Sequence, residues 1–176
     1  MAVKSLADGR TKLAVLATAP ADPSAPTVTE LDAGIDASCR IAKTGYTLGP
    51  TTSETINDPE LCVDVNSTVY GASNYEGTFS VFRYYDDTTN QVDVTGDEVY
   101  QALKTKGTEV WLVERETAKK SEEPWEAGDE VSVYRVLLDN PQKSSDRTGY
   151  IKSTIVPAIQ AGYLDAAVAA GGGAGE

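Results

Sequence analysis

The sequence predicts a mainly β fold: an antiparallel β-sandwich or flattened barrel with one α-helix on its flank. Several short runs alternate apolar and polar side chains, as strands do, and segments rich in Gly, Pro, Asn and Ser separate them. Only one segment has clear helical spacing of its apolar residues. The chain has 176 residues, of which 40% are hydrophobic, so it is long enough to bury one core.

Residues 78–85 form the clearest predicted strand. Phe79 and Val81 point to one face of it. Phe82 and Tyr84 point to the other face. Because both faces carry bulky side chains, we expect each of them to be covered, either by the core or by another surface.

A polar loop at residues 86–93 leads to the predicted helix, which ends at Gly107. Thr95 and Glu98 have the spacing of a capping box, which would satisfy two of the first free backbone amides. Three apolar residues on one face and two lysines in the last turn support the helix: Val99, Ala102, Leu103, Lys104 and Lys106.

The other predicted elements are shorter. Strands are expected at residues 11–18, 38–42, 109–115, 130–138 and 149–155, and a helical turn is expected at residues 30–36. Residues 45–73 are irregular, with short strands at 63–65 and 68–70. A segment this long is either a functional loop, a surface loop or an unrecognised hairpin.

The charge of the chain excludes several classes of function. Its net charge is -12 and its pI is near 4.4, which argues against a nucleic-acid-binding surface and against binding to anionic membranes. The sequence has no histidine, which removes Ser-His-Asp and Cys-His catalysis and histidine metal sites. We therefore expect no enzymatic activity, no cofactor, no metal site and no membrane association.

Two weaker sequence patterns concern metal binding and cysteine chemistry. The acidic loop from residue 86 departs from an EF-hand, because Gln91 and Asp97 stand where that motif needs Gly and Glu, and a solvated turn is the simpler interpretation. Cys39 and Cys62 have neither zinc-binding nor redox-motif spacing, so we expect two free thiols.

Four segments together resemble a known family. They are SNYEGTFSVFRYYDD (residues 73–87), AGDEVSVYRV (127–136), TELDAGIDAS (29–38) and TINDPELC (55–62). In this order they are similar to the major tail tube protein of long-tailed, siphovirus-type bacteriophages, above all those of actinobacterial hosts. The resemblance covers residues 1–157.

The resemblance implies a tail tube fold and a structural role in the virion tail, with assembly in the host cytoplasm. Hexameric rings would stack into a hollow tube through which phage DNA passes without specific binding. The partners would be further copies of the chain, the tape measure and other tail proteins. Residues 1–157 would form the tail tube domain, with residues 45–73 as a loop reaching the next ring. Beyond this domain, the composition of residues 158–176 by itself predicts an Ala/Gly-rich, flexible C-terminal tail.

Contacts between subunits are expected where aromatic or charged side chains need a second surface. Trp125 lies in a charged connection, and Arg135 lies on an otherwise apolar strand face. Alternatively, other residues of the same chain cover the candidate side chains. The candidate contact residues are Tyr46, Leu48, Pro59, Leu61, Tyr70, Tyr75, Trp125 and Arg135.

Two other functions remain compatible with the sequence. An acidic β-sandwich could recognise carbohydrate or a host surface through exposed aromatic side chains, and it would then be a monomer or a small oligomer. A related ring-forming component, such as a secretion-system tube or a tail terminator, would share the assembly behaviour. Electron microscopy of the purified protein separates the binding module from the ring-forming proteins.

Overall fold

A computed structural model of the chain describes residues 4–62, 64, 68–144 and 147–171. One antiparallel sheet has five strands, in the order β11 (Ala158–Ala167), β8 (Glu130–Leu137), β7 (Glu109–Glu116), β1 (Thr11–Leu16) and β2 (Ile35–Asp36). A second antiparallel sheet has four, in the order β3 (Thr47–Thr51), β6 (Asn74–Phe82), β10 (Lys152–Ile155) and β9 (Gln142–Lys143). A separate pair is formed by β4 (Thr55–Ile56) and β5 (Val69–Tyr70).

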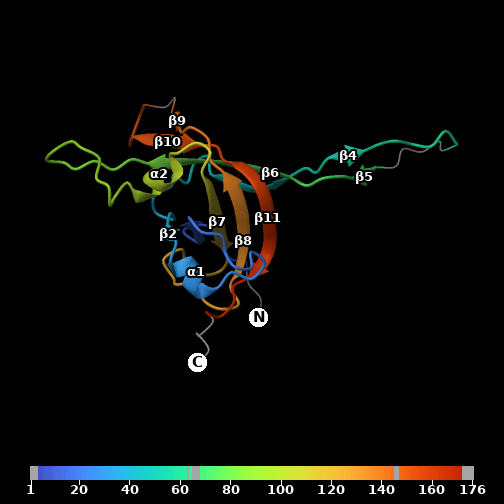
Figure 1. Cartoon of the computed structure of the whole chain (residues 1–176), viewed down its shortest axis with the longest axis horizontal. Helices are drawn as coiled ribbons and strands as arrows, with labels where there is room; N and C mark the ends of the chain where they lie inside the picture. The colour runs from blue at the N-terminus through green and yellow to red at the C-terminus, as the bar shows by residue number, and fades with distance from the viewer. Residues whose placement is uncertain (1–3, 63, 65–67, 145–146, 172–176) are drawn as a thin grey trace.

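The two larger sheets pack face to face, which confirms the predicted mainly β, sandwich-like class. Their strands cross at a steep angle, because β6 runs over the ends of β7, β8 and β11 (Figure 1). This is the arrangement of orthogonally packed sheets. The strands predicted at residues 11–18, 78–85, 109–115, 130–138 and 149–155 correspond to β1, β6, β7, β8 and β10.

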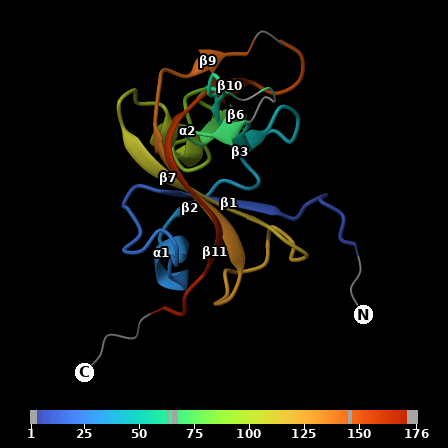
Figure 2. The ribbon, with the colours of Figure 1, turned by 90° about the vertical axis from the view of Figure 1, so that its right-hand side faces the viewer.

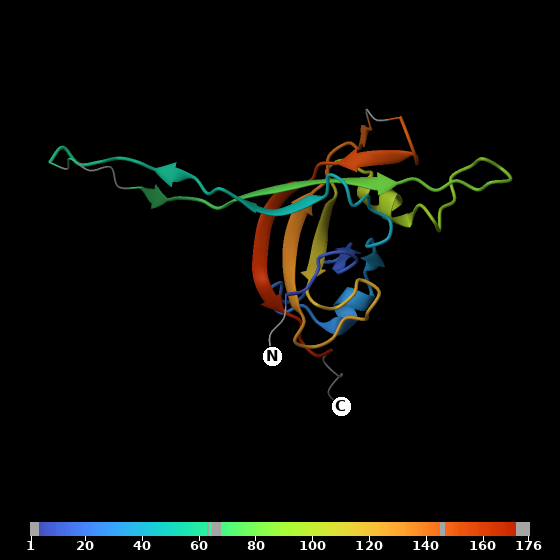
Figure 3. The same ribbon diagram turned by 180° about the vertical axis from the view of Figure 1, so that it is seen from behind.

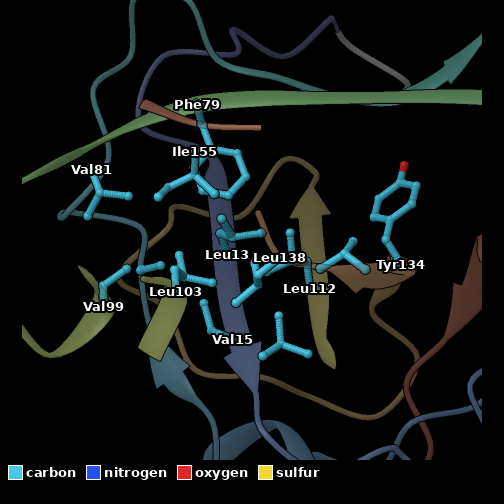
Figure 4. Packing of buried hydrophobic residues seen from close by; sticks show 13 residues of the cluster. Leu13, Val15, Phe79, Val81, Val99, Leu103, Leu112, Tyr134, Leu138 and Ile155 are labelled. Atoms are coloured by element: carbon cyan, nitrogen blue, oxygen red, sulfur yellow. The ribbon is translucent and has the colours of Figure 1, made fainter. Parts of the chain in front are cut away.

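The three central strands of the five-stranded sheet are buried on both faces. On the face toward the second sheet, Leu13 and Leu112 pack under Phe79 and Ile155 (Figure 4). Val136 belongs to the same cluster. On the opposite face, a second cluster includes Ala14, Leu16, Trp111, Val113, Val131 and Val133. In β6, by contrast, Phe79 and Val81 are fully buried and Phe82 is half-buried. The strands buried on two sides are therefore β1, β7 and β8.

Two short helices cover this sheet assembly, whereas the sequence predicted one. The helix α1 (Val28–Asp32) replaces the helical turn expected at residues 30–36, and Figure 2 shows it beside the five-stranded sheet. Its Leu31 side chain belongs to the second cluster. Its N-terminus has a capping box: Thr27 Oγ1 accepts from the Glu30 amide at 3.3 Å, and Glu30 Oε2 accepts from the Thr27 amide at 2.8 Å. Among the described residues, no helix is long and apolar enough to cross a membrane.

The helix α2 (Glu98–Leu103) is shorter than predicted, and the capping box expected at Thr95 and Glu98 is wrong. The N-cap residue is Asp97, and its side chain makes no capping bond. Its carboxylate instead accepts two bonds from the Arg83 guanidinium, at 2.9 and 3.0 Å, and one from the Tyr84 amide. The helix start is therefore fixed by a contact with the end of β6.

Residues 158–167 differ from the expectation of a flexible tail, whereas residues 172–176, which that expectation also covers, lie outside the described residues. Residues of β11 pair with β8 along its whole length, with register shifts after Ile159 and after Tyr163. Pro157 is the corner at which the chain leaves one sheet, in β10, and enters the other, in β11. The small residues of β11 allow close packing, because a Cβ on Gly162 would lie 2.5 Å from the Tyr75 ring.

The three remaining short strands predicted from the sequence have different outcomes. In residues 38–42, Ile41 makes a single bridge with Val81, and no strand forms. The strand expected at 68–70 corresponds to β5. Val63 and Val65, in the strand expected at 63–65, lie outside the described residues.

A buried arginine holds the connection between β7 and β8 against the sheet. The Arg115 side chain is fully buried, and its Nη1 atom donates to Asp129 Oδ2 and to the Pro124 carbonyl, both at 2.8 Å. Its Nη2 atom donates to the carbonyls of Lys120 and Glu123. One side chain therefore satisfies three loop carbonyls and a buried carboxylate.

We expect Arg115→Ala to lower the free energy of unfolding by about 2–4 kcal/mol, because the Pro124 carbonyl loses its donor and the buried Asp129 carboxylate loses its guanidinium partner, keeping only the bonds from Lys119 and the Glu126 amide. Denaturant unfolding measures the loss. Lys106→Ala is the matched control, since the Lys106–Asp139 pair, at 3.2 Å, is mostly exposed to solvent, and its loss should cost less than about 0.5 kcal/mol. Equal losses for the two variants would contradict a structural role for Arg115.

Candidate assembly surfaces

A two-stranded ribbon projects from the body of the molecule (Figures 1 and 3). We call residues 52–73 the arm; it continues the pairing of β3 with β6 beyond the Thr51–Asn74 pair. Thr55 pairs with Tyr70 and Ile56 with Val69. The described part of the irregular segment predicted at residues 45–73 is therefore a hairpin, which was one of the alternatives left open by the sequence.

The described surface of the arm is both apolar and acidic. Its large apolar side chains are more than half exposed: Ile56 at 55%, Val69 at 61%, Tyr70 at 73% and Leu61 at 108%. The arm contains four carboxylates and no Lys or Arg: Glu54, Asp58, Glu60 and Asp64. A two-stranded ribbon is marginally stable by itself in water, so this surface is suited to being covered by a partner.

The root of the arm is fastened to the core of its own chain. Tyr46, Leu48 and Tyr75 pack against the first core cluster. Tyr75 meets the Tyr134 ring edge-on, with ring centroids 6.3 Å apart, and its hydroxyl donates to the Gly162 carbonyl at 3.4 Å. These three predicted contact residues therefore have cover within the chain.

A carboxyl group with an altered pKa lies beneath this root. The Tyr46 hydroxyl donates to Glu114 Oε1 at 2.8 Å. Burial raises the pKa of Glu114 to about 7, and the nearby Glu116 adds to the rise, while the bond from Tyr46 opposes it. The arm is thus anchored on a side chain that titrates near neutral pH.

The other predicted contact residues lie in different environments. Pro59 and Leu61 are exposed on the arm, as is Tyr70. Trp125 is 5% exposed and is covered by Lys12 and Arg115, each 5.2 Å from its ring centroid, so the chain itself provides its cover. Arg135 is half-exposed, with its Nε atom 3.5 Å from Glu109 Oε2.

A second surface lies at the far end of β6. We call it the groove; it has a volume of about 590 Å³ and is lined by Cys39, by residues 82–85, and by Tyr150 and Ile151. Phe82 meets Tyr150 edge-on, with ring centroids 5.9 Å apart. Tyr150 is 82% exposed and Ile151 is 63% exposed. Sequence reasoning missed this surface, although the paired Tyr150 and Ile151 in a polar segment were a visible signal.

The acidic loop beside the groove uses its carboxylates to hold its own backbone. Asp86 Oδ1 accepts from the amides of Thr88 and Thr89, at 3.1 and 2.7 Å, and these bonds lower the pKa of Asp86. Burial opposes ionisation of Asp97, but the bonds from Arg83, Gln101 and the Tyr84 amide outweigh it and lower its pKa. Within the described residues, no three potential ligands come together as a metal site.

A model of the phage tail tube protein family matches residues 1–172, and the chain belongs to this family. No curated protein matches it. The protein is therefore a structural component of a bacteriophage tail tube, and family membership favours this role over the carbohydrate-binding module considered from the sequence.

We expect Glu114→Gln to become more stabilising as the pH rises from 5 to 8. Because the folded-state pKa is raised, the protonated form is favoured on folding, and its contribution to stability is lost between the unfolded value of 4.5 and about 7. Gln cannot ionise, so the stability difference between variant and wild type should grow by about 1–2 kcal/mol, a value reduced for partial solvent access.

Denaturant unfolding at several pH values measures this difference. Glu76→Gln, which changes an exposed carboxylate near the same root, is the control and should show a much smaller trend. A pH-independent difference for Glu114→Gln would contradict the raised pKa.

Proposed function

We propose that this chain assembles into hexameric rings that stack into the hollow tail tube of a siphovirus-type phage. The tube is the conduit through which phage DNA leaves the particle. The host is an actinobacterium, as the four segments resembling tail proteins of such phages suggest, and assembly takes place in its cytoplasm. The tape measure and other tail proteins are the remaining partners.

The observation that carries this proposal is the arm. It extends exposed apolar side chains away from the body on a ribbon whose root is anchored in the core. The side chains of Leu61 and Tyr70 stay exposed in the folded chain. Burying them against another subunit would therefore contribute to the free energy of association. A tube-forming protein needs such a contact to link one ring to the next.

Closure of each ring is supported by the open edges of both sheets. β11 is an edge strand of ten residues whose pairing partner is β8. Exposed strand edges favour pairing with another chain. A head-to-tail contact of this kind gives a ring where the rotation closes.

The acidity of the chain suits a channel for DNA. Each chain contributes a net charge of -12, and charge on the lumen wall repels phosphates over about 8 Å at physiological salt. A basic wall would bind DNA through counterion release and retard it. We predict a negative lumen in a reconstruction of the tube by cryo-electron microscopy; a neutral or basic lumen would remove this part of the proposal.

Deletion of the arm tests its role in stacking. Thr51 and Asn74 are paired directly, so an Asn-Gly turn can replace residues 52–73 and close the β3–β6 hairpin. We expect the wild-type protein to form uniform hollow tubes in negative-stain electron microscopy at high concentration. The shortened protein should remain folded and give monomers or single rings, because the link between rings is missing.

The control keeps the arm and replaces the exposed Leu6, which lies outside it, by Ser. This variant should form tubes as wild type does. Circular dichroism confirms that the shortened chain is folded. Normal tubes from the shortened chain would exclude the arm as the link, and a wild-type protein that stays monomeric at every concentration would count against the tube itself.

A further inference from the structure

We propose that protonation of Glu114 controls how firmly the root of the arm is held on the body of the subunit. With Glu114 protonated, β3 stays packed over the five-stranded sheet; with Glu114 ionised, this corner of the molecule opens to water more often. The inference concerns the folded chain itself and goes beyond the proposed function. Three features support it: a hydrogen bond between the two sheets, a cavity lined by carboxylates, and the position of β3 at a sheet edge.

The hydrogen bond joins two different sheets. Its donor is the hydroxyl of Tyr46, the residue directly before β3, and its acceptor is Oε1 of Glu114, in β7 of the five-stranded sheet. The two oxygen atoms are 2.8 Å apart. The Tyr46 ring lies against Phe79, with ring centroids 6.2 Å apart. Because both the ring and the hydroxyl are held, Tyr46 fastens the start of β3 to the sheet beneath it.

A small cavity gathers carboxylates around Glu114. It has a volume of about 100 Å³ and is lined by Glu114, Glu116, Glu130, Val131 and Ser132. Glu114 is half-buried, whereas Glu116 and Glu130 are exposed. Within the described residues, this lining contains no Lys or Arg. Like charges close to a half-buried carboxyl group favour its neutral form.

In the described part of the chain, the strands beside β7 bring no cation to this face of the sheet. Leu13 of β1 and Ser132 of β8 are the register partners of Glu114. Lys12 and Arg115 point to the opposite face, where each lies over the same tryptophan ring. An ionised Glu114 therefore has no counter-charge within the sheet.

Among the described residues, the groups packed over this face supply no counter-charge either. Burial raises the pKa of Tyr134, on β8, so its hydroxyl stays neutral. Asp165, on β11, adds a further negative charge near Tyr134. Lys43, in the segment before β3, contacts Asp8 instead. The closed structure thus favours the protonated form of Glu114.

The edge position of β3 makes this corner able to open locally. β3 is the last strand of its sheet, and its one ladder is with β6. From Asn74 to Thr78, β6 pairs with β3, and from Phe79 to Phe82 it pairs with β10. The root is therefore a two-stranded hairpin lying on the other sheet. Because such a hairpin is marginally stable alone, it depends on contacts with the sheet below.

The direction of the effect follows from linkage between opening and protonation. In the closed structure the pKa of Glu114 is about 7, and an opening that exposes the side chain to water returns it toward the ordinary value of 4.5. The closed state therefore holds its proton at pH values where the open state has lost it. As a result, the open fraction increases as the pH rises between these two values.

Hydrogen–deuterium exchange of the unassembled full-length protein, corrected for the intrinsic pH dependence of amide exchange, measures this opening. From pH 5 to pH 8, the opening constant of the β3 amides should rise about tenfold or more. Amides of β7, at the centre of its sheet, should stay more protected than those of β3 at every pH. A pH-independent opening constant, or β3 and β7 exchanging together, would overturn the inference. The measurement needs no tubes, so its failure would leave the proposed function standing.

Three variants assign the effect to Glu114. Glu114→Gln should abolish the pH trend of the β3 amides, because the side chain can no longer ionise. Glu116→Gln should move the midpoint of the trend to lower pH, because it removes a like charge from the cavity. Glu76→Gln, which removes one exposed carboxylate from the same hairpin, is the matched control and should keep the wild-type trend. A trend that persists in Glu114→Gln, or that disappears in Glu76→Gln, would contradict the assignment.

Discussion

The burial of both faces of the central strands is the constraint on which the rest of this structure depends. β1, β7 and β8 carry apolar side chains on both sides, so neither face can remain in water. One face is covered by the second sheet, which brings β6 across the ends of these strands. The other face is covered by α1 and by the β7–β8 connection. The positions of the arm and the groove follow, because both are extensions of β6.

Adjacent residues of β7 stabilise the two covers by different means. Arg115 points to the face covered by the connection, where it binds a carboxylate and three carbonyls. Glu114 points to the opposite face, where it accepts a bond from Tyr46 at the root of the arm. The alternation of a strand therefore places a permanently charged group under a loop that must stay closed. It also places a group that can change its charge under the part of the molecule that projects outward.

The sequence predicted the elements whose pattern is local, and it missed those fixed by distant contacts. Short apolar or alternating runs of side chains were sufficient to locate β1, β6, β7 and β8. The start of α2 was not, because Asp97 is bound by Arg83, fourteen residues earlier. β11 has little pattern of its own and depends on β8 and on Tyr75 lying over Gly162.

The predicted contact residues also differ in whether distant parts of the chain cover them. Leu61 and Tyr70 are exposed, as a contact residue must be, whereas Trp125 is covered by Arg115 through a loop that no periodicity reveals. The groove draws its walls from three separate parts of the chain, so Tyr150 and Ile151 marked one wall in the sequence, but their spacing could not show which other segments join them.

The continuity of β6 has a mechanical consequence. A pull on the arm acts along the axis of this strand, which is bonded to β3 over its first half and to β10 over its second half. Hydrogen bonds between antiparallel strands lie across that axis, so such a pull loads them together in shear instead of opening them one after another. The body of the subunit is thus built to resist tension along the direction in which its arm extends.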